Sequence, residues 1–286
     1  DPYERIHAPR TVEVPDLHRV PLEPEEDLLL FIRDHNPYLA EWERDLLTIV
    51  HEEAQYFIPQ IETKIMNEGW ASFWHHRILS SLELPQALQM EFMVHHSQVV
   101  RPHAGQINPY YVGFKMWHDL VRRADDPAAQ DSAAVGEASG VCGMEWIFQI
   151  REVDRDSSFL RRFLNQPLME ELDLFEYRRK GADYVATKVS DEENWQDVKQ
   201  SLLRSVGMAA FPVLRIDDAD FRGSRTLHVS HDFDGRELNL GDAEKTLAYL
   251  HQLWGRPVVL ETVLRGKRTA LTYGKEGFSK EALIAA

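Results

Sequence analysis

Residues 56–79 read YFIPQIETKIMNEGWASFWHHRIL and place an acid and two histidines among tryptophan, phenylalanine and isoleucine. On a helix that turns 100° per residue, the apolar side chains of residues 60–79 spread over almost the whole circumference, which is typical of a buried helix. Lys64, Glu68 and His75 nevertheless fall on one face. A buried carboxylate has to be ion-paired, protonated or metal-bound, because burying it alone is strongly unfavourable. The stretch therefore predicts a buried helix that contains a polar site.

Two interpretations of this polar face remain open. In the first, Lys64 and Glu68, four residues apart, form an ion pair, and His75 completes a structural network by a hydrogen bond. In the second, Glu68 and His75 are two ligands of a metal ion. Seven of the thirteen histidines lie between residues 51 and 118. Because imidazole is a common ligand of transition metals, this concentration favours the second interpretation.

The surrounding sequence predicts a mainly helical region over residues 24–124. Pro59 is expected to interrupt the helix that precedes the metal-site candidates, because a proline removes one backbone donor and clashes with the preceding turn. A second helix is expected from there to about Leu82. Asn108 followed by Pro109 is typical of a helix start, with the asparagine as the N-cap.

The remaining segments differ from this helical region in composition and periodicity. Residues 1–23 carry four prolines and predict an extended strap. Residues 125–140 are small, polar and aperiodic, which predicts a linker, and residues 141–180 predict a helical connector. Residues 181–286 alternate strand and helix in the order β-α-β-β-α-β-β, which favours a small ferredoxin-like α+β domain. The predicted fold class is therefore α+β, with a mainly helical N-terminal region before that domain.

Composition excludes several kinds of partner. Of 286 residues, 32 are Lys or Arg and 47 are Asp or Glu, which gives a formal net charge of −15. So acidic a chain repels nucleic-acid phosphates and anionic lipids. No apolar run approaches the roughly 20 residues that span a bilayer, so membrane insertion is not expected. The single Cys142 excludes an internal disulfide and is typical of a reducing compartment. We therefore expect a cytoplasmic protein.

Several segments together resemble one known family. They are YFIPQIETKIMNEGWASFWHHRIL, INPYYVGFKMWHDL, ELDLFEY, HDFDGRELNL and AEKTLAYLHQLWGRPVVLET. In this order, over nearly the whole chain, they resemble the stage V sporulation protein R (SpoVR) family. The resemblance implies a bacterial cytoplasmic protein that takes part in forming the spore cortex or cell-envelope peptidoglycan.

The resemblance also implies a set of site residues. Glu68 and His75 match the family pattern, as does one histidine of the pair at residues 95–96, which we take to be His96. A divalent metal, zinc or manganese, would be held by these three side chains. The side chains implied to act at the reacting bond are Glu68 and Asn67, and those implied to support them are Gln60 and Lys64.

Two functions from different classes follow. The first is a metal-dependent hydrolase acting on a peptide-like or cell-wall-precursor substrate. Family members are longer at the N-terminus, and the sequence begins at Asp1 without methionine. A histidine-containing segment from that longer region is therefore expected to complete the site. The alternative is a non-enzymatic regulatory or scaffold protein that binds protein partners, in which Glu68 and His75 form a structural network. A weaker third option treats the C-terminal domain as a small-molecule sensor, by analogy of fold alone.

Overall fold

The structure is a computed structural model that describes residues 27–102, 107–125, 143–174, 176–180, 183–188 and 194–283. The chain divides into two compact units. The α+β unit contains the described residues of Asp1–Ala54 and Phe211–Ala286, and the helical unit contains those of Gln55–Ala210. The predicted strap at 1–23 lies outside the described residues, as does all of the predicted linker at 125–140 except its first residue.

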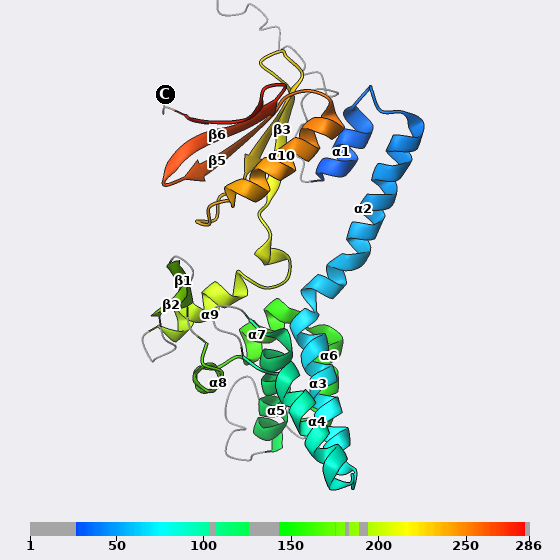
Figure 1. Cartoon of the computed structure of the whole chain (residues 1–286), viewed down its shortest axis with the longest axis vertical. Helices are drawn as coiled ribbons and strands as arrows, with labels where there is room; N and C mark the ends of the chain where they lie inside the picture. The colour runs from blue at the N-terminus through cyan, green and yellow to red at the C-terminus, as the bar shows by residue number, and fades with distance from the viewer. Residues whose placement is uncertain are drawn as a thin grey trace, which may run out of the picture. The chain divides into compact units, whose positions relative to one another are not determined.

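The helical unit is built on helices that mostly follow the prediction (Figure 1). Its helices are the end of α2 (Glu41–Glu62), then α3 (Lys64–Ser81), α4 (Gln86–Val99), α5 (Pro109–Asp125), α6 (Gly143–Val153), α7 (Asp156–Phe163), α8 (Gln166–Glu171) and α9 (Trp195–Leu203). Its core is rich in aromatic side chains, including Phe73, Trp117, Trp146, Phe159 and Phe163. α5 starts as expected, because the side-chain oxygen of Asn108 accepts a hydrogen bond of 3.0 Å from the Tyr110 backbone N–H.

Helices α3 and α5 touch through their backbones at two glycines. A Cβ atom added to Gly69 would lie 2.3 Å from the backbone of Gly113, and one added to Gly113 would lie 2.2 Å from the carbonyl oxygen of Ile65. Such distances are far inside van der Waals contact, so only glycine permits this approach. The indole N–H of Trp117 donates to the carbonyl oxygen of Met66 at 3.2 Å and joins the same two helices. The two glycines thus fix how closely α3 and α5 lie.

The prediction for Pro59 was wrong. α2 continues through this proline to Glu62, and the break to α3 comes at Thr63. A proline inside a helix removes one backbone hydrogen bond without necessarily ending the helix. The Thr63 hydroxyl donates to the carbonyl oxygen of Pro59 at 2.6 Å, so this carbonyl has a partner where the helix ends.

In the described residues, the α+β unit is a five-stranded sheet with helix α10 (Leu240–Trp254) packed on one face (Figure 1). The strands are β3 (Leu214–Phe221), β4 (Thr226–His231), β5 (Val258–Leu264), β6 (Lys267–Gly274) and β7 (Gly277–Ala282). They lie side by side in sequence order, antiparallel except for the parallel pair β4–β5. A parallel pair needs a crossover, and α10 provides it. α1 (Leu28–His35) adds Phe31 and Ile32 to the core between sheet and helix.

The α+β class is confirmed, while the ferredoxin-like arrangement of residues 181–286 is corrected. The strand predicted near ADYVATKVS exists as β2 (Asp183–Lys188), but it pairs with β1 (Glu176–Lys180) in a separate two-stranded sheet. α9, predicted beside it, belongs to the helical unit. Of the two helices predicted for the ferredoxin-like unit, only α10 packs on the described five-stranded sheet. Alternation along the chain predicts the elements, but it does not specify which strands pair.

Candidate functional site

Four histidines from three helices meet at one place in the helical unit. His75 and His76 lie on α3, His96 on α4 and His118 on α5. The ring centroid of His76 lies 5.0 Å from that of His96 and 5.7 Å from that of His118, and His75 stacks on His96 at 6.2 Å. We call these four side chains the histidine cluster. His76 is its central member, because its ring contacts a histidine on each of the two neighbouring helices.

Two phenylalanines separate and support these rings. Phe114 contacts His96 at 4.9 Å and His118 at 4.6 Å between ring centroids. Phe92 contacts His75 at 5.4 Å and His96 at 5.8 Å. These edge-to-face and tilted contacts hold flat rings in place while offering no hydrogen-bond partner. The histidine cluster therefore lies in a largely apolar setting.

This setting favours the neutral form of three imidazoles. Burial lowers the pKa of His76, His96 and His118, and for His118 it lowers the pKa to about 4. The neighbouring imidazoles lower these pKa values further, because a second positive charge close by is unfavourable. Near pH 7 the rings of His76, His96 and His118 are thus in the form that has one donor and one acceptor nitrogen, which is also the form that binds metal ions.

Two ring nitrogens of the cluster lack a hydrogen-bond partner among the described residues. They are Nε2 of His96 and Nε2 of His118, and both atoms are buried. His96 as a whole is only 9% exposed. Buried polar atoms are nearly always paired in folded proteins, and leaving one unpaired costs about 1–3 kcal/mol. A buried polar atom without a partner therefore calls for a specific explanation, such as a bound water, ion or ligand.

The start of α3 is fixed by a carboxylate from another helix. Asp156, the first residue of α7, accepts hydrogen bonds from the backbone N–H groups of Ile65 at 2.8 Å and Met66 at 2.9 Å. These are two of the donors that every helix start leaves unpaired. Burial raises the pKa of Asp156 to about 6, although the backbone hydrogen bonds act to lower it. The helix that carries two members of the cluster is therefore anchored by a single buried side chain.

Glu68, the predicted carboxylate ligand, has a partner on another helix. Within the described residues, Glu68 pairs with Tyr110 on α5, and their hydrogen bond raises the pKa of the Tyr110 phenol. It does not form the ion pair with Lys64 that the structural interpretation required. His75 lies seven residues further along α3, about 10 Å along the helix axis. The rings of His75 and His96, the other two predicted ligands, are in contact.

The remaining predicted site residues lie on the surface. Gln60, Lys64 and Asn67 are exposed, as is His75, while Glu68 is half-buried. The side-chain amide of Asn67 donates to the Thr63 hydroxyl at 2.9 Å. Their predicted roles at a reacting bond stay predictions, because an exposed side chain can still face a substrate.

The donor types fit a zinc or manganese ion only in part. Imidazoles bound to one such ion have nitrogens about 2.0–2.1 Å from it, which places the ring centroids about 5–6 Å apart. The two centroid distances from His76 lie in this range. However, in the ranges that the structure describes, no three His, Cys, Asp or Glu side chains are arranged to hold a metal ion. The cluster supplies neutral imidazoles for such an ion, not a complete ligand set.

Sequence reasoning did not select His76, His118 or Phe114. Adjacent histidines point about 100° apart on a helix, so the sequence alone allowed one of His75 and His76 to face a given partner and did not specify which. A usable signal lay in the glycines. His76 follows Gly69 by two helical turns, so it lies on the face of α3 that approaches α5.

The fold and the site define a class: an α+β protein whose helical unit carries a histidine cluster with two buried ring nitrogens that have no partner among the described residues. The family model described as "SpoVR like protein" matches residues 3–211, and that described as "SpoVR-like C-terminal domain" matches residues 212–265. The chain therefore belongs to the SpoVR family.

A curated relative agrees with this assignment. It is the Escherichia coli (strain K12) protein named "Uncharacterized protein YcgB", which is 31% identical over 264 residues. The match covers 87% of this chain and 51% of the relative. The chain thus spans about half the length of the curated relative that it matches. None of the solved structures matches the chain.

Within the described ranges, none of the helices combines the length and the apolar character that crossing a bilayer requires.

Proposed function

We propose that this chain is the metal-binding part of a SpoVR-family hydrolase that acts in the bacterial cytoplasm on a peptide-like bond of a cell-envelope or spore-cortex peptidoglycan precursor. The observation that carries the proposal is the pair of buried, unpaired nitrogens on His96 and His118. Because each costs stability and neither has a structural partner, binding a ligand is the simplest reason for keeping them. The family resemblance supplies the substrate class.

In this proposal, His75 and His96 hold a zinc or manganese ion, with Glu68 as the predicted carboxylate. Further ligands come from outside the described residues. A bound divalent ion would polarise a carbonyl and lower the pKa of a water molecule. Hydrolysis of a peptide bond also needs a group that takes a proton from water and delivers it to the departing amine. Glu68 is the candidate for this transfer if it is not itself a ligand, and Asn67 is the candidate for orienting the substrate.

Metal content distinguishes these roles. The chain is purified, incubated with zinc or manganese, and analysed by mass spectrometry beside His96→Ala, Glu68→Gln and the matched control His95→Ala. His95 is the neighbour of His96 on α4, but its side chain is 67% exposed and lies near Glu91. We expect metal to be lost in His96→Ala and kept in His95→Ala. Loss in Glu68→Gln assigns Glu68 as a ligand, whereas retention assigns it to proton transfer.

The same measurement on the Escherichia coli relative tests whether ligands outside this chain complete the site. Stoichiometric metal in the relative, with weaker binding by this chain, supports a site shared with those residues. Equal binding by wild type, His96→Ala and His95→Ala contradicts the assignment of the ligands. Absence of metal from both proteins contradicts the metal-dependent function.

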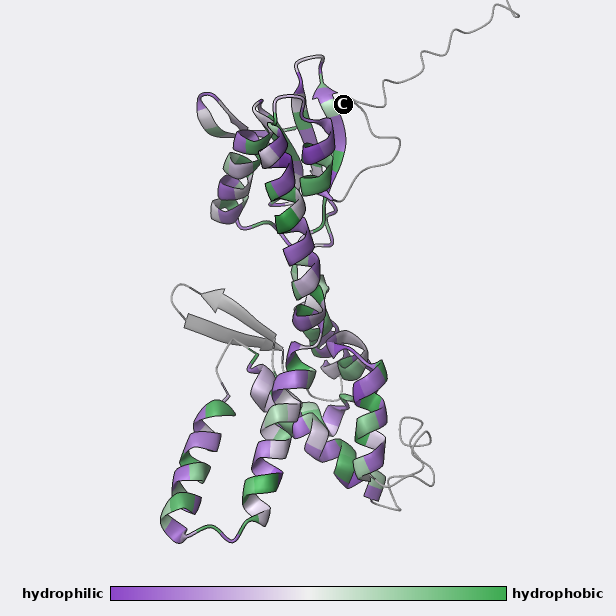
Figure 2. Ribbon diagram, turned by 90° about the vertical axis from the view of Figure 1, so that its right-hand side faces the viewer, coloured by the Kyte–Doolittle hydropathy of each residue, from purple (hydrophilic) through white to green (hydrophobic). Residues whose placement is uncertain are grey.

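A scaffold function is the second candidate, and one observation favours it. Helix α4 is unusually apolar on its outside, since Leu88, Met90, Met93 and Val94 are each more than half exposed. The ribbon of the hairpin of α3 and α4, at the lower left of Figure 2, carries green, hydrophobic segments. Exposed apolar patches of this kind often mark protein-binding surfaces. If no metal binds, co-purification of partners with wild type and with Met93→Lys is the next measurement.

A further inference from the structure

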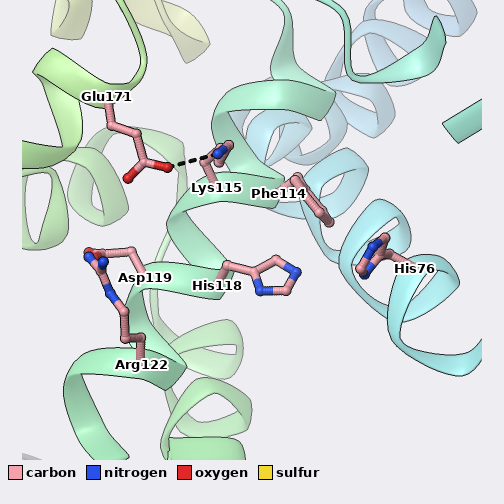
Figure 3. A pocket seen from close by; sticks show the side chains of 7 residues that line it. All are labelled: His76, Phe114, Lys115, His118, Asp119, Arg122 and Glu171. Carbon is pink, nitrogen blue, oxygen red and sulfur yellow. Dashed lines mark hydrogen bonds and ion pairs between the residues drawn. The ribbon is translucent and has the colours of Figure 1, made fainter. Parts of the chain in front are cut away.

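A cavity of about 320 Å³ lies beside the histidine cluster (Figure 3). Its side chains come from α3, α5 and α8. They are His76, Phe114, Lys115, His118, Asp119, Arg122 and Glu171. The volume lies at the lower end of the range for small-molecule sites, about 300–1,000 Å³. A ligand of this size has about as many atoms as an amino acid or a dipeptide.

The lining of the cavity is charged on one side. Lys115 and Glu171 form an ion pair of 2.7 Å between Nζ and Oε1, and Asp119 pairs with Arg122 (Figure 3). Asp119 is only 5% exposed and is also paired with Arg123, so its charge is well balanced. The Lys115–Glu171 pair is more accessible, with side chains 31% and 46% exposed. A ligand can therefore reach this pair, and each of its two side chains can pair with a charged group of the ligand instead of with the other.

The other side of the cavity is formed by flat rings. His118 contacts Phe114, and His76 contacts both, with ring centroids between 4.6 and 5.7 Å apart. Burial lowers the pKa of His118 to about 4, so its ring adds no charge near pH 7. Its buried Nε2 has no partner among the described residues, so a hydrogen-bonding atom of a ligand would satisfy it.

The charges that line the cavity cancel. Two cationic and two anionic side chains face it, although the whole chain has a formal charge of −15. A ligand with a net charge would leave an unbalanced charge in a partly desolvated site, which is unfavourable. A zwitterion avoids this, because each of its charged ends meets an opposite charge. The lining therefore selects for a molecule with separate positive and negative ends.

We propose that this cavity binds a small zwitterion of the amino-acid or dipeptide class. The ligand carboxylate pairs with Lys115, and its ammonium group pairs with Glu171. The body of the ligand lies over Phe114, and one of its polar atoms hydrogen-bonds to Nε2 of His118. This inference rests on the proposed function only for its biological meaning, namely that the cavity would hold the free end of a peptide-like substrate. Binding itself requires no metal.

Calorimetric titration of the chelator-treated chain with alanyl-alanine tests the proposal. Three blocked forms accompany it: the N-acetyl peptide, the C-terminal amide and the doubly blocked peptide. We expect each block to weaken binding at least tenfold. Lys115→Met should weaken the free dipeptide at least tenfold and leave the C-terminal amide unaffected. Glu171→Gln should also weaken binding of the free dipeptide at least tenfold, but it should leave binding of the N-acetyl peptide unaffected.

Two further variants keep the test independent of folding. His118→Phe retains a ring of similar shape without Nε2, and should weaken binding while circular dichroism stays unchanged. Arg215→Met removes one partner of an ion pair of 3.2 Å with Asp232 in the α+β unit, and should leave binding unchanged. Repeating the titration with D-alanyl-D-alanine shows which stereochemistry the cavity prefers.

The inference is overturned if the doubly blocked peptide binds as well as the free one. It is also overturned if Lys115→Met and Glu171→Gln show no selectivity between the singly blocked forms, or if no dipeptide binds at millimolar concentration. Dipeptide binding in a chain that takes up no metal would leave the inference intact and contradict the metal-dependent function. Metal uptake without dipeptide binding would overturn the inference and leave the metal-dependent function intact.

Discussion

The histidines of the two units differ in their hydrogen bonding. In the α+β unit, Nε2 of His228 lies 3.1 Å from Glu261, and Nδ1 of His231 lies 2.9 Å from the Thr262 hydroxyl. His251 is bonded to the carbonyl oxygen of Arg256 at 2.7 Å. Each of these rings has a partner that explains its place in the fold.

In the helical unit, the rings of His96 and His118 contact aromatic side chains, and one buried nitrogen of each is unpaired in the described structure. The difference teaches that the number of histidines in a region is a weaker guide to function than their hydrogen bonding. A partnered histidine stabilises its own unit, whereas an unpartnered buried one costs stability and so indicates another use.

The largest effect is expected from the contact that brings the helical site together. Gly69→Ala places a methyl group where α3 meets the backbone of α5, so the two helices must separate. We expect the free energy of unfolding of the helical unit to fall by about 3 kcal/mol or more, at the upper end for overpacking. Urea unfolding followed by tryptophan fluorescence measures this.

The matched control is Gly241→Ala in α10 of the α+β unit. The added Cβ would lie 3.4 Å from the side chain of Asn239, and the backbone there is helical. Stability should change by less than about 1 kcal/mol, since alanine favours a helix by roughly that amount. If both substitutions had the same effect, the close approach of α3 and α5 would not be what assembles the cluster.

The next effect is a dependence of stability on pH. The pKa of Asp156 is about 6 in the folded protein and lower when unfolded, so the folded state binds this proton more tightly. Between about pH 4 and 6 the free energy of unfolding therefore falls as pH rises, by about 2–3 kcal/mol in total. Asp156→Asn should abolish this slope in unfolding measured across that range.

Glu171 provides a control of opposite sign. Lys115 lowers the pKa of Glu171, so this carboxyl binds its proton less tightly in the folded state. Its contribution to stability is present above the unfolded pKa and is lost as pH falls through the folded pKa. Glu171→Gln should therefore remove a small increase in the free energy of unfolding with rising pH. An unchanged slope in Asp156→Asn would show that other groups control the pH response.

A smaller effect tests the histidine comparison directly. His118→Phe removes an unpaired polar atom and keeps a ring, so we expect unfolding free energy to stay the same or rise by about 1 kcal/mol. His231→Phe leaves the Thr262 hydroxyl without its partner and should lower it by about 1–2 kcal/mol. Thermal unfolding measures both changes. A loss of stability in His231→Phe but not in His118→Phe would support the comparison, and a loss of equal size in both variants would refute it.

The smallest effect is expected for the charged rim of the cavity. Lys115→Met breaks a partly exposed ion pair with Glu171, and such pairs contribute about 0–1 kcal/mol. The melting temperature should therefore hardly change. A large drop in the melting temperature would assign this ion pair to the stability of the fold and away from ligand binding.

Local elements of the fold could be predicted where local chemistry specifies them. The asparagine–proline start of α5 and the helical pattern of α3 and α4 were readable in the sequence. Pro59 was misjudged, because a proline inside a helix removes one backbone hydrogen bond without necessarily ending the helix. The pairing of β1 with β2 was also missed, because residues 176–180, which form β1, had been predicted to be part of a helical connector.

The sequence by itself determined the class of protein: its helices, its acidic charge, its family and the concentration of histidines on α3, α4 and α5. Only the tertiary structure decided which of them meet. Helical periodicity specifies the face on which a side chain lies but not the partner of that face. Here the partner is set by the backbone contact of Gly69 with Gly113, which turns His76 toward His118 and leaves Glu68 with Tyr110.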